Sequence, residues 1–165
     1  MRIPLIAAAL LQGLLFASTP AGAAVTVSFV DSDRYTDAGA SANDRQRAMA
    51  EIERHLRRLG DRHFAAGQNF KIEVLDIDLA GRMRFVRRFP DEVRVVDGRT
   101  DWPRIKLRYT LESAGKVTKS GEETVSDLDY LSAPRAPGSS EPLYYEKRML
   151  DDWYLARFGK QPRGP

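Results

Sequence analysis

Alternation of apolar and polar residues predicts several short strands in this chain. At residues 25–30, Val25, Val27 and Phe29 fall on one face of an extended segment. Residues 103–111 alternate most regularly and divide into an apolar set and a polar set: Ile105, Leu107, Tyr109 and Leu111 against Arg104, Lys106, Arg108 and Thr110. Short strands are also predicted at residues 93–96 and 116–125. The second of these is polar and contains Gly121, as suits a sheet edge.

The strand predicted at residues 70–79 changes phase within its length. Its apolar residues form two sets on opposite faces: Phe70, Ile72 and Val74, then Leu75, Ile77 and Leu79. A regular pleat cannot bury both sets on one side. Either both faces of this strand are partly covered, or a β-bulge near Val74 and Leu75 resets the phase and keeps Asp76 and Asp78 outward.

The turn that follows the most regular strand can have two lengths. A two-residue loop leaves Val117 on the solvent-facing side. A three-residue loop at residues 113–115 pairs Val117 with Leu111 in the core and sets Lys106 opposite Glu122. Because it buries Val117, the three-residue loop is the one that the sequence favours.

Two segments have apolar residues at spacings of three and four, which is typical of helices that pack on one face. The first is predicted at residues 44–59, with Gly60 ending the helix. The second has Pro142 in its first turn, with Ser140 or Glu141 as its N-cap. The element order β-α-β-β-β-β-α then predicts an α+β fold. We expect a two-layer sandwich with a mostly antiparallel sheet of about five strands and both helices on one face.

The first 23 residues have the pattern of a secretory signal peptide. Arg2 gives a basic start, residues 3–17 are uncharged and largely apolar, and residues 21–23 place small side chains at a cleavage site. The apolar run is shorter than the roughly 20 residues that cross a bilayer, which favours cleavage over a retained anchor. The mature chain is therefore expected to start at Ala24 and to be exported.

The remaining chain is predicted to be one α+β domain at residues 24–158, followed by a flexible tail at residues 159–165. No later stretch is long and apolar enough to span a membrane, so the mature protein is not expected to be transmembrane. The sequence contains no cysteine, which excludes disulfides and thiolate metal sites. A formal net charge of +3 is too mild to indicate a nucleic-acid partner.

No catalytic or cofactor motif is present, and we predict no catalytic residue, cofactor or metal site. His55 and His63 lie eight residues apart, too far along a helix to share one ion. Paired acids can perform acid–base chemistry. A hydrolase-like enzyme that uses acids at the sheet end therefore remains the alternative, with five candidates: Asp76, Asp78, Asp127, Asp129 and Glu146.

Glu146 lies at the edge of the apolar face of the second helix. An acid is costly to bury there unless it is paired or hydrogen-bonded. We expect a basic or donor partner, such as Arg135 from the preceding loop, and a structural role.

Basic residues interleaved with aromatic ones form the candidate functional surface. Such a surface attracts an anionic polymer or the head groups of phospholipid or lipopolysaccharide. Alternatively, these cations keep an open sheet face solvated and pair with Glu122 and its neighbours. The candidate surface consists of Arg84, Arg87, Arg88, Arg104, Lys106 and Arg108.

A series of segments in one order carries a family resemblance: residues 25–30, Asp76-Ile-Asp78-Leu-Ala-Gly81, 103–109, 115–117, 120–122, 127–131 and 142–153. Together they resemble the domain of unknown function 3016, a family of exported proteobacterial proteins. The resemblance implies a bacterial, periplasmic protein and supplies no activity or catalytic residue. We therefore expect an exported, non-enzymatic binding or accessory protein of the bacterial envelope. Its expected partner is an anionic envelope component or an envelope protein.

Overall fold

The computed structural model describes residues 23–85, 87, 92–98, 100–132 and 141–159. Its elements, in chain order, are β1 (Ala24–Phe29), a 3-10 turn (Ser32–Arg34), α1 (Ala42–His63), β2 (Gln68–Asp78), β3 (Arg82–Phe85), β4 (Glu92–Val95), β5 (Arg104–Ser113), β6 (Lys116–Ser126) and α2 (Tyr144–Phe158). Every predicted strand and helix is present in the predicted order, but β3 is a further strand that the sequence did not predict.

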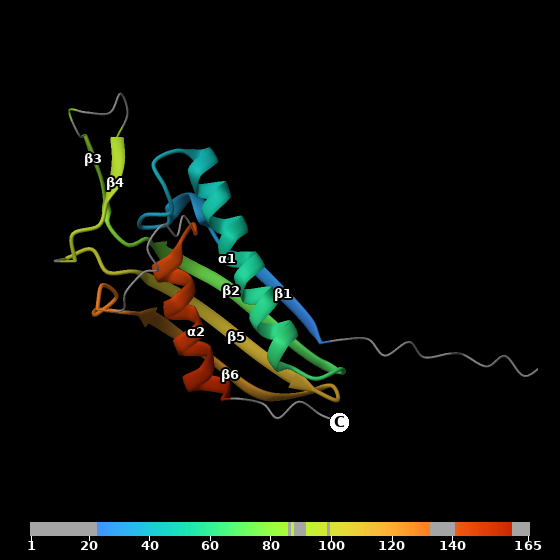
Figure 1. Ribbon diagram of the computed structural model, residues 1–165. Helices are drawn as coiled ribbons and strands as arrows, with labels where there is room; N and C mark the ends of the chain where they lie inside the picture. Colours follow the sequence, from blue (N-terminus) through green and yellow to red (C-terminus); the bar gives the residue numbers. More distant parts are fainter. Residues whose placement is uncertain (1–22, 86, 88–91, 99, 133–140, 160–165) are drawn as a thin grey trace, which may run out of the picture.

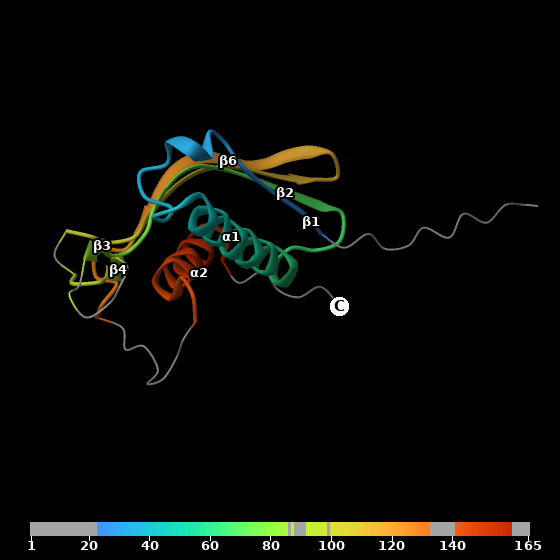
Figure 2. The same ribbon diagram turned by 90° about the horizontal axis from the view of Figure 1, so that it is seen from above.

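The main sheet has four strands in the order β1-β2-β5-β6, and both helices cover one of its faces (Figures 1 and 2). The α+β class and the two layers are confirmed. The expected single sheet of about five strands is wrong, because within the described part of the chain β3 and β4 pair with each other and not with the main sheet. β1 lies parallel to β2, since α1 provides the crossover between them, and the other pairs are antiparallel.

The chain leaves the main sheet at Gly81. This residue has a φ of 78°, and a Cβ there would lie 2.5 Å from the backbone oxygen of Val95. Only glycine fits such a position. The Gly81 amide donates to the Asp101 carbonyl at 2.9 Å, so the chain departs and returns at the same place. Between these two points β3 and β4 form a hairpin that stands away from the end of the sheet (Figure 1).

The core fills the space between the sheet and the helices. Ile52 and Leu56 of α1 are fully buried in one cluster with Ile72 of β2. The helix does not end at Gly60 as predicted, but continues to His63. A Cβ on Gly60 would lie 2.4 Å from Cγ2 of Val25. The glycine therefore allows close packing of α1 on β1 instead of terminating the helix.

Of the two alternatives for β2, the structure shows the bulge. Val74 pairs with Leu107 and Asp76 pairs with Lys106, so Leu75 is the extra residue. The apolar residues on both sides of the bulge consequently point into the core: Phe70, Ile72 and Val74 before it, and Ile77 after it. The bulge also places Asp76 and Asp78 opposite cations of β5 on the open face.

The β5–β6 turn has two residues, and the predicted three-residue loop is wrong. Ala114 and Gly115 both have positive φ, at 50° and 74°, as a type I′ turn requires. Val117 is consequently 59% exposed. A second bulge follows at Thr118, since Glu112 pairs with Val117 but Leu111 pairs with Lys119. The bulge absorbs the odd residue that the prediction assigned to the loop.

The start of α2 also differs from the prediction. Leu143, with a φ of 53° and no side-chain cap, is the N-cap, so neither Glu141 nor Pro142 has its expected position. Ser140 lies outside the described residues. Leu143 packs against the core, which fixes the chain where the helix begins. Over the described part of the chain, none of the helices combines the length and apolar character that a bilayer crossing needs.

Candidate functional site

The predicted basic row lies on the open face of the sheet, and acids from the neighbouring strands meet it. Lys106 pairs with Glu122 at 3.0 Å, although the register sets Lys106 opposite Thr124. Arg108 contacts both Glu122, at 2.8 Å, and Glu73, at 2.9 Å. Hydrogen bonds from Lys106 and Arg108 hold the pKa of Glu122 below its usual range.

Arg104 completes this row and pairs with Asp78 of β2, with an Nε–Oδ2 distance of 3.0 Å. Its guanidinium also lies 5.2 Å from the ring centroid of Trp102. All three cations of the row therefore have carboxylate partners. This charge balance is what the solvation alternative expects.

Of the rest of the predicted surface, Arg84 belongs to a different sheet, the β3–β4 hairpin, and Arg87 follows β3 in the chain. We name β3, β4 and Arg87 together the arm. Arg84 pairs with Asp97 at 2.8 Å and keeps 47% of its side chain exposed. Phe85 is 71% exposed, and Arg87 is exposed beside it in the chain. Arg88 lies outside the described residues.

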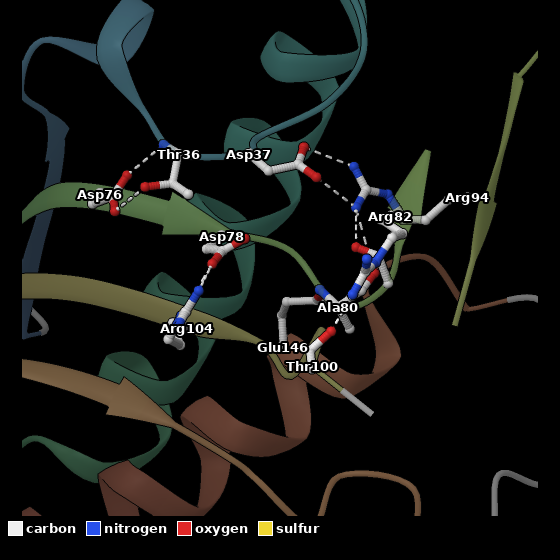
Figure 3. A network of polar contacts seen from close by, with 11 residues as sticks. Thr36, Asp37, Asp76, Asp78, Ala80, Arg82, Arg94, Thr100, Arg104 and Glu146 are labelled. Carbon is white, nitrogen blue, oxygen red and sulfur yellow. Dashed lines mark hydrogen bonds and ion pairs between the residues drawn. The ribbon is translucent and has the colours of Figure 1, made fainter. Parts of the chain in front are cut away.

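Arg94 of β4 clamps the arm to the body (Figure 3). Its two terminal nitrogens donate to the two carboxylate oxygens of Asp37, at 2.9 and 2.8 Å. The Nη1 atom also donates to the carbonyl of Gly81 at 3.0 Å. Asp37 is itself fixed to the end of β2, because its amide donates to Ile77 and its carbonyl accepts from Leu79. This bidentate geometry is the strong form of an arginine–carboxylate pair.

Asp101 fixes the chain where it returns from the arm to the main sheet. Its carboxylate accepts hydrogen bonds from the amides of Asp97 and Gly98, at 3.2 and 3.1 Å, and from the hydroxyl of Tyr130 at 2.8 Å. Burial opposes ionisation of Asp101, but these donors outweigh it and hold its pKa below the usual range. The segment between β4 and β5 is thus fixed to Tyr130, which follows β6.

Glu146 of α2 reaches the same junction from the helix side (Figure 3). It is 3% exposed, and its Oε1 accepts from the amide of Ala80 at 2.8 Å. Burial raises the pKa of Glu146. The expected donor partner is therefore confirmed, but it is a backbone amide, and Arg135 lies outside the described residues. Glu146 therefore holds the amide of Ala80, and Arg94 holds the carbonyl of the next residue, Gly81.

The acids of the hydrolase-like alternative have separate partners. Asp76 accepts from the amide and hydroxyl of Thr36, both at 2.7 Å, and Asp127 pairs with Arg148 at 2.7 Å. Asp129 is exposed. Among the residues that the structure describes, no three acids or histidines group as a metal site would require. Asp76, Asp78 and Asp127 are therefore each held by a hydrogen bond or ion pair that fixes neighbouring elements to one another.

The two histidines also have different surroundings. His55 is buried, and its Nε2 lies 2.8 Å from Oδ1 of Asp151. Its Nδ1 faces Arg58, which can only donate, so the ring proton belongs on Nε2. His63 packs on the ring of Tyr154, with the centroids 5.0 Å apart. His55 therefore links the two helices.

Sequence reasoning missed the clamp at the base of the arm. In the sequence, Asp37 is one residue of a polar loop, and Arg94 is one of several basic residues in its segment, so nothing links the two. The two are 57 residues apart in the chain and meet only because β4 folds back beside the end of β2. The one local signal was the segment from Asp76 to Gly81, whose glycine marks the exit from the sheet.

Comparison with known proteins agrees with the resemblance noted in the sequence. No curated protein matches this chain. The family described as Protein of unknown function (DUF3016) matches residues 23–156. This range contains the sheet, the arm, the clamp residues and Glu146, and it ends within α2. Because the match spans most of the sequence, the chain belongs to the DUF3016 family.

Proposed function

We propose that this protein is an exported, non-enzymatic domain of the periplasm whose arm binds the anionic head groups of envelope lipids. The observation that carries the proposal is the arm itself. It stands away from the sheet (Figure 1). Its exposed side chains include Arg82, Arg84, Phe85 and Arg87. The periplasmic location rests on the signal-peptide pattern of the first 23 residues.

The chemistry of the arm suits a lipid surface. Cations near an anionic membrane gain about 1 kcal/mol each, and an exposed aromatic ring can enter the interfacial layer. Phe85 is the most exposed of the large apolar side chains in the described residues, at 71%. The basic row on β5 contributes less to attraction, because all three of its cations pair with Glu73, Glu122 or Asp78. On the arm, Arg84 pairs with Asp97, whereas the structure gives Arg82 and Arg87 no acid partner among the described residues.

The clamp at the base supports this role. Arg94 fixes the arm to the body through Asp37, and Asp101 fixes the segment that follows β4. A binding element that is already ordered loses less conformational entropy on association. The arm is therefore presented as a fixed projection rather than a loose loop.

We expect the double variant Arg84→Gln, Arg87→Gln to bind anionic vesicles roughly 30-fold more weakly, because two cations contribute about 2 kcal/mol. The measurement is co-sedimentation of the mature protein with phosphatidylglycerol–phosphatidylethanolamine vesicles over a salt series. Binding of the native protein should weaken as salt rises. Phosphatidylcholine vesicles serve as the neutral surface.

The matched control is Arg47→Gln, Arg54→Gln, which removes the same charge from exposed ion pairs on α1. This control should retain most of the binding, and Phe85→Ser should lower it. An equal loss in the control would show that net charge, not the arm, drives attachment. Binding that ignores salt would also contradict the proposal.

Export predicts a defined mature end. When the full chain is expressed in a Gram-negative host, mass spectrometry of the periplasmic fraction should find Ala24 or a neighbour at the N-terminus. β1 begins at Ala24 and the family match begins at residue 23, in agreement with cleavage there. An intact Met1 on a membrane-bound product would overturn this expectation.

A further inference from the structure

A groove runs along the free edge of the main sheet, between β6 and α2. Its volume is about 420 Å³. One wall is the consecutive stretch of residues 124–127, and the other is a face of α2 with Met149, Asp152, Trp153 and Ala156. Asp152 and Trp153 follow Met149 by three and four positions, and Ala156 follows them by the same spacings, so the four residues share one face. The groove therefore combines a strand edge with a helix face.

We propose that this groove binds an extended peptide with apolar and basic side chains, which adds to β6 as a further strand. Such strand addition uses backbone hydrogen bonds for affinity and alternate side chains for specificity. The proposal is independent of the lipid-binding role, because the groove contains no residue of the arm.

The backbone of β6 is available for this pairing. Within the described residues β6 pairs with β5 alone and forms the last strand of the sheet. Four residues of an added strand would cover about 13 Å of this edge. At the beginning of β6, Lys116 and Lys119 disfavour pairing with another strand, as lysines commonly do at sheet edges. No lysine or arginine occurs at residues 124–127, where the groove lies.

The helix side offers a preformed apolar surface. Met149 is 2% exposed and Trp153 is 9% exposed, and both line the groove. The indole of Trp153 is held in place because its Nε1 donates to Oε2 of Glu123 at 3.2 Å. Ala156 also lines the groove and is exposed and small, so it leaves room there for an incoming side chain.

Charge selects a basic partner. Asp152 is exposed at the rim of the groove, and no hydrogen bond or ion pair holds it among the described residues. Asp127, the other acid of the groove, is neutralised by Arg148. Of the residues that the structure describes, no lysine or arginine lines the groove. A lysine or arginine two positions from an apolar residue would share its face of an added strand and meet Asp152.

The test is an NMR titration of uniformly ¹⁵N-labelled mature protein. The probe is a capped eight-residue peptide in which threonines alternate with leucine and lysine. We expect it to shift the amide signals of residues 124–127 and to slow their hydrogen exchange. The same peptide with glutamate in place of lysine should bind at least tenfold more weakly. A version with its alternate amides methylated should not bind, because it lacks the backbone donors.

Asp152→Lys should lower the affinity for the lysine peptide at least tenfold. Asp61→Lys is the matched control, since Asp61 is an exposed acid on α1, and it should have no effect. Shifts outside the groove, binding by the methylated peptide, or an unchanged affinity in Asp152→Lys would overturn the proposal. Dimerisation without peptide that broadens the β6 signals would assign the edge to a second copy of this chain instead.

Discussion

Replacing Trp153 by alanine is expected to lower the free energy of unfolding by about 3–5 kcal/mol. The indole is 9% exposed and packs edge-on against Phe158 and Tyr109, with ring centroids 5.7 and 5.8 Å apart. Its removal empties a large site between α2 and the sheet. It also takes one hydrogen-bond donor from Glu123, which binds Tyr109 and Arg157 as well.

Urea denaturation followed by circular dichroism measures this loss. Trp153→Phe separates the two contributions, because it keeps a ring but removes the bond to Glu123, and it should cost about 1–2 kcal/mol. Trp102→Phe is the control for the loss of an indole outside the core cluster. A loss below about 1 kcal/mol in Trp153→Ala would contradict the packing described for α2.

The second large effect is expected at Glu146. Glu146→Ala leaves the buried amide of Ala80 without its acceptor and should destabilise the fold by about 2–3 kcal/mol. Glu146→Gln keeps an oxygen in reach of that amide and should cost much less near neutral pH. The comparison isolates the hydrogen bond from the charge.

The charge of Glu146 adds a pH dependence of known sign. Burial raises its pKa above the ordinary value of 4.5, so the folded protein retains a proton that the unfolded chain releases. The stability of the native protein should therefore fall as pH rises from about 4.5 through the raised pKa. Glu146→Gln cannot titrate and should lack this fall. A stability difference between the two proteins that stays constant from pH 4 to 8 would contradict the burial of this carboxylate.

Local patterns predicted the elements of this fold well. The bulge in β2 followed from two apolar sets and two aspartates, because a period of two leaves few other solutions. The β5–β6 turn was misjudged by the same counting, since an unseen bulge at Thr118 took up the odd residue. The helix end at Gly60 was wrong because the reason for that glycine, Val25, lies on another element.

The functional surface was less predictable than the fold. Arg84 and Arg104 stand in one basic stretch of sequence, yet the turn at Gly81 places them on separate sheets with separate acid partners. Whether an acid neutralises the charge of a given cation depends on pairs of residues that are distant in the sequence. Arg108 and Glu73, for example, are 35 residues apart. Such pairs exist only once the strand order is known.

The bond between Glu146 and Ala80 also bears on the order in which the molecule is assembled. Its partners are 66 residues apart, and one of them belongs to the last helix. A chain that folds progressively from its N-terminus can form β1, α1 and β2 early, but it completes the support of the arm only after α2 has docked. The projecting hairpin thus gains its fixed direction at the end of folding, so a truncated chain that lacks α2 would present it without this support.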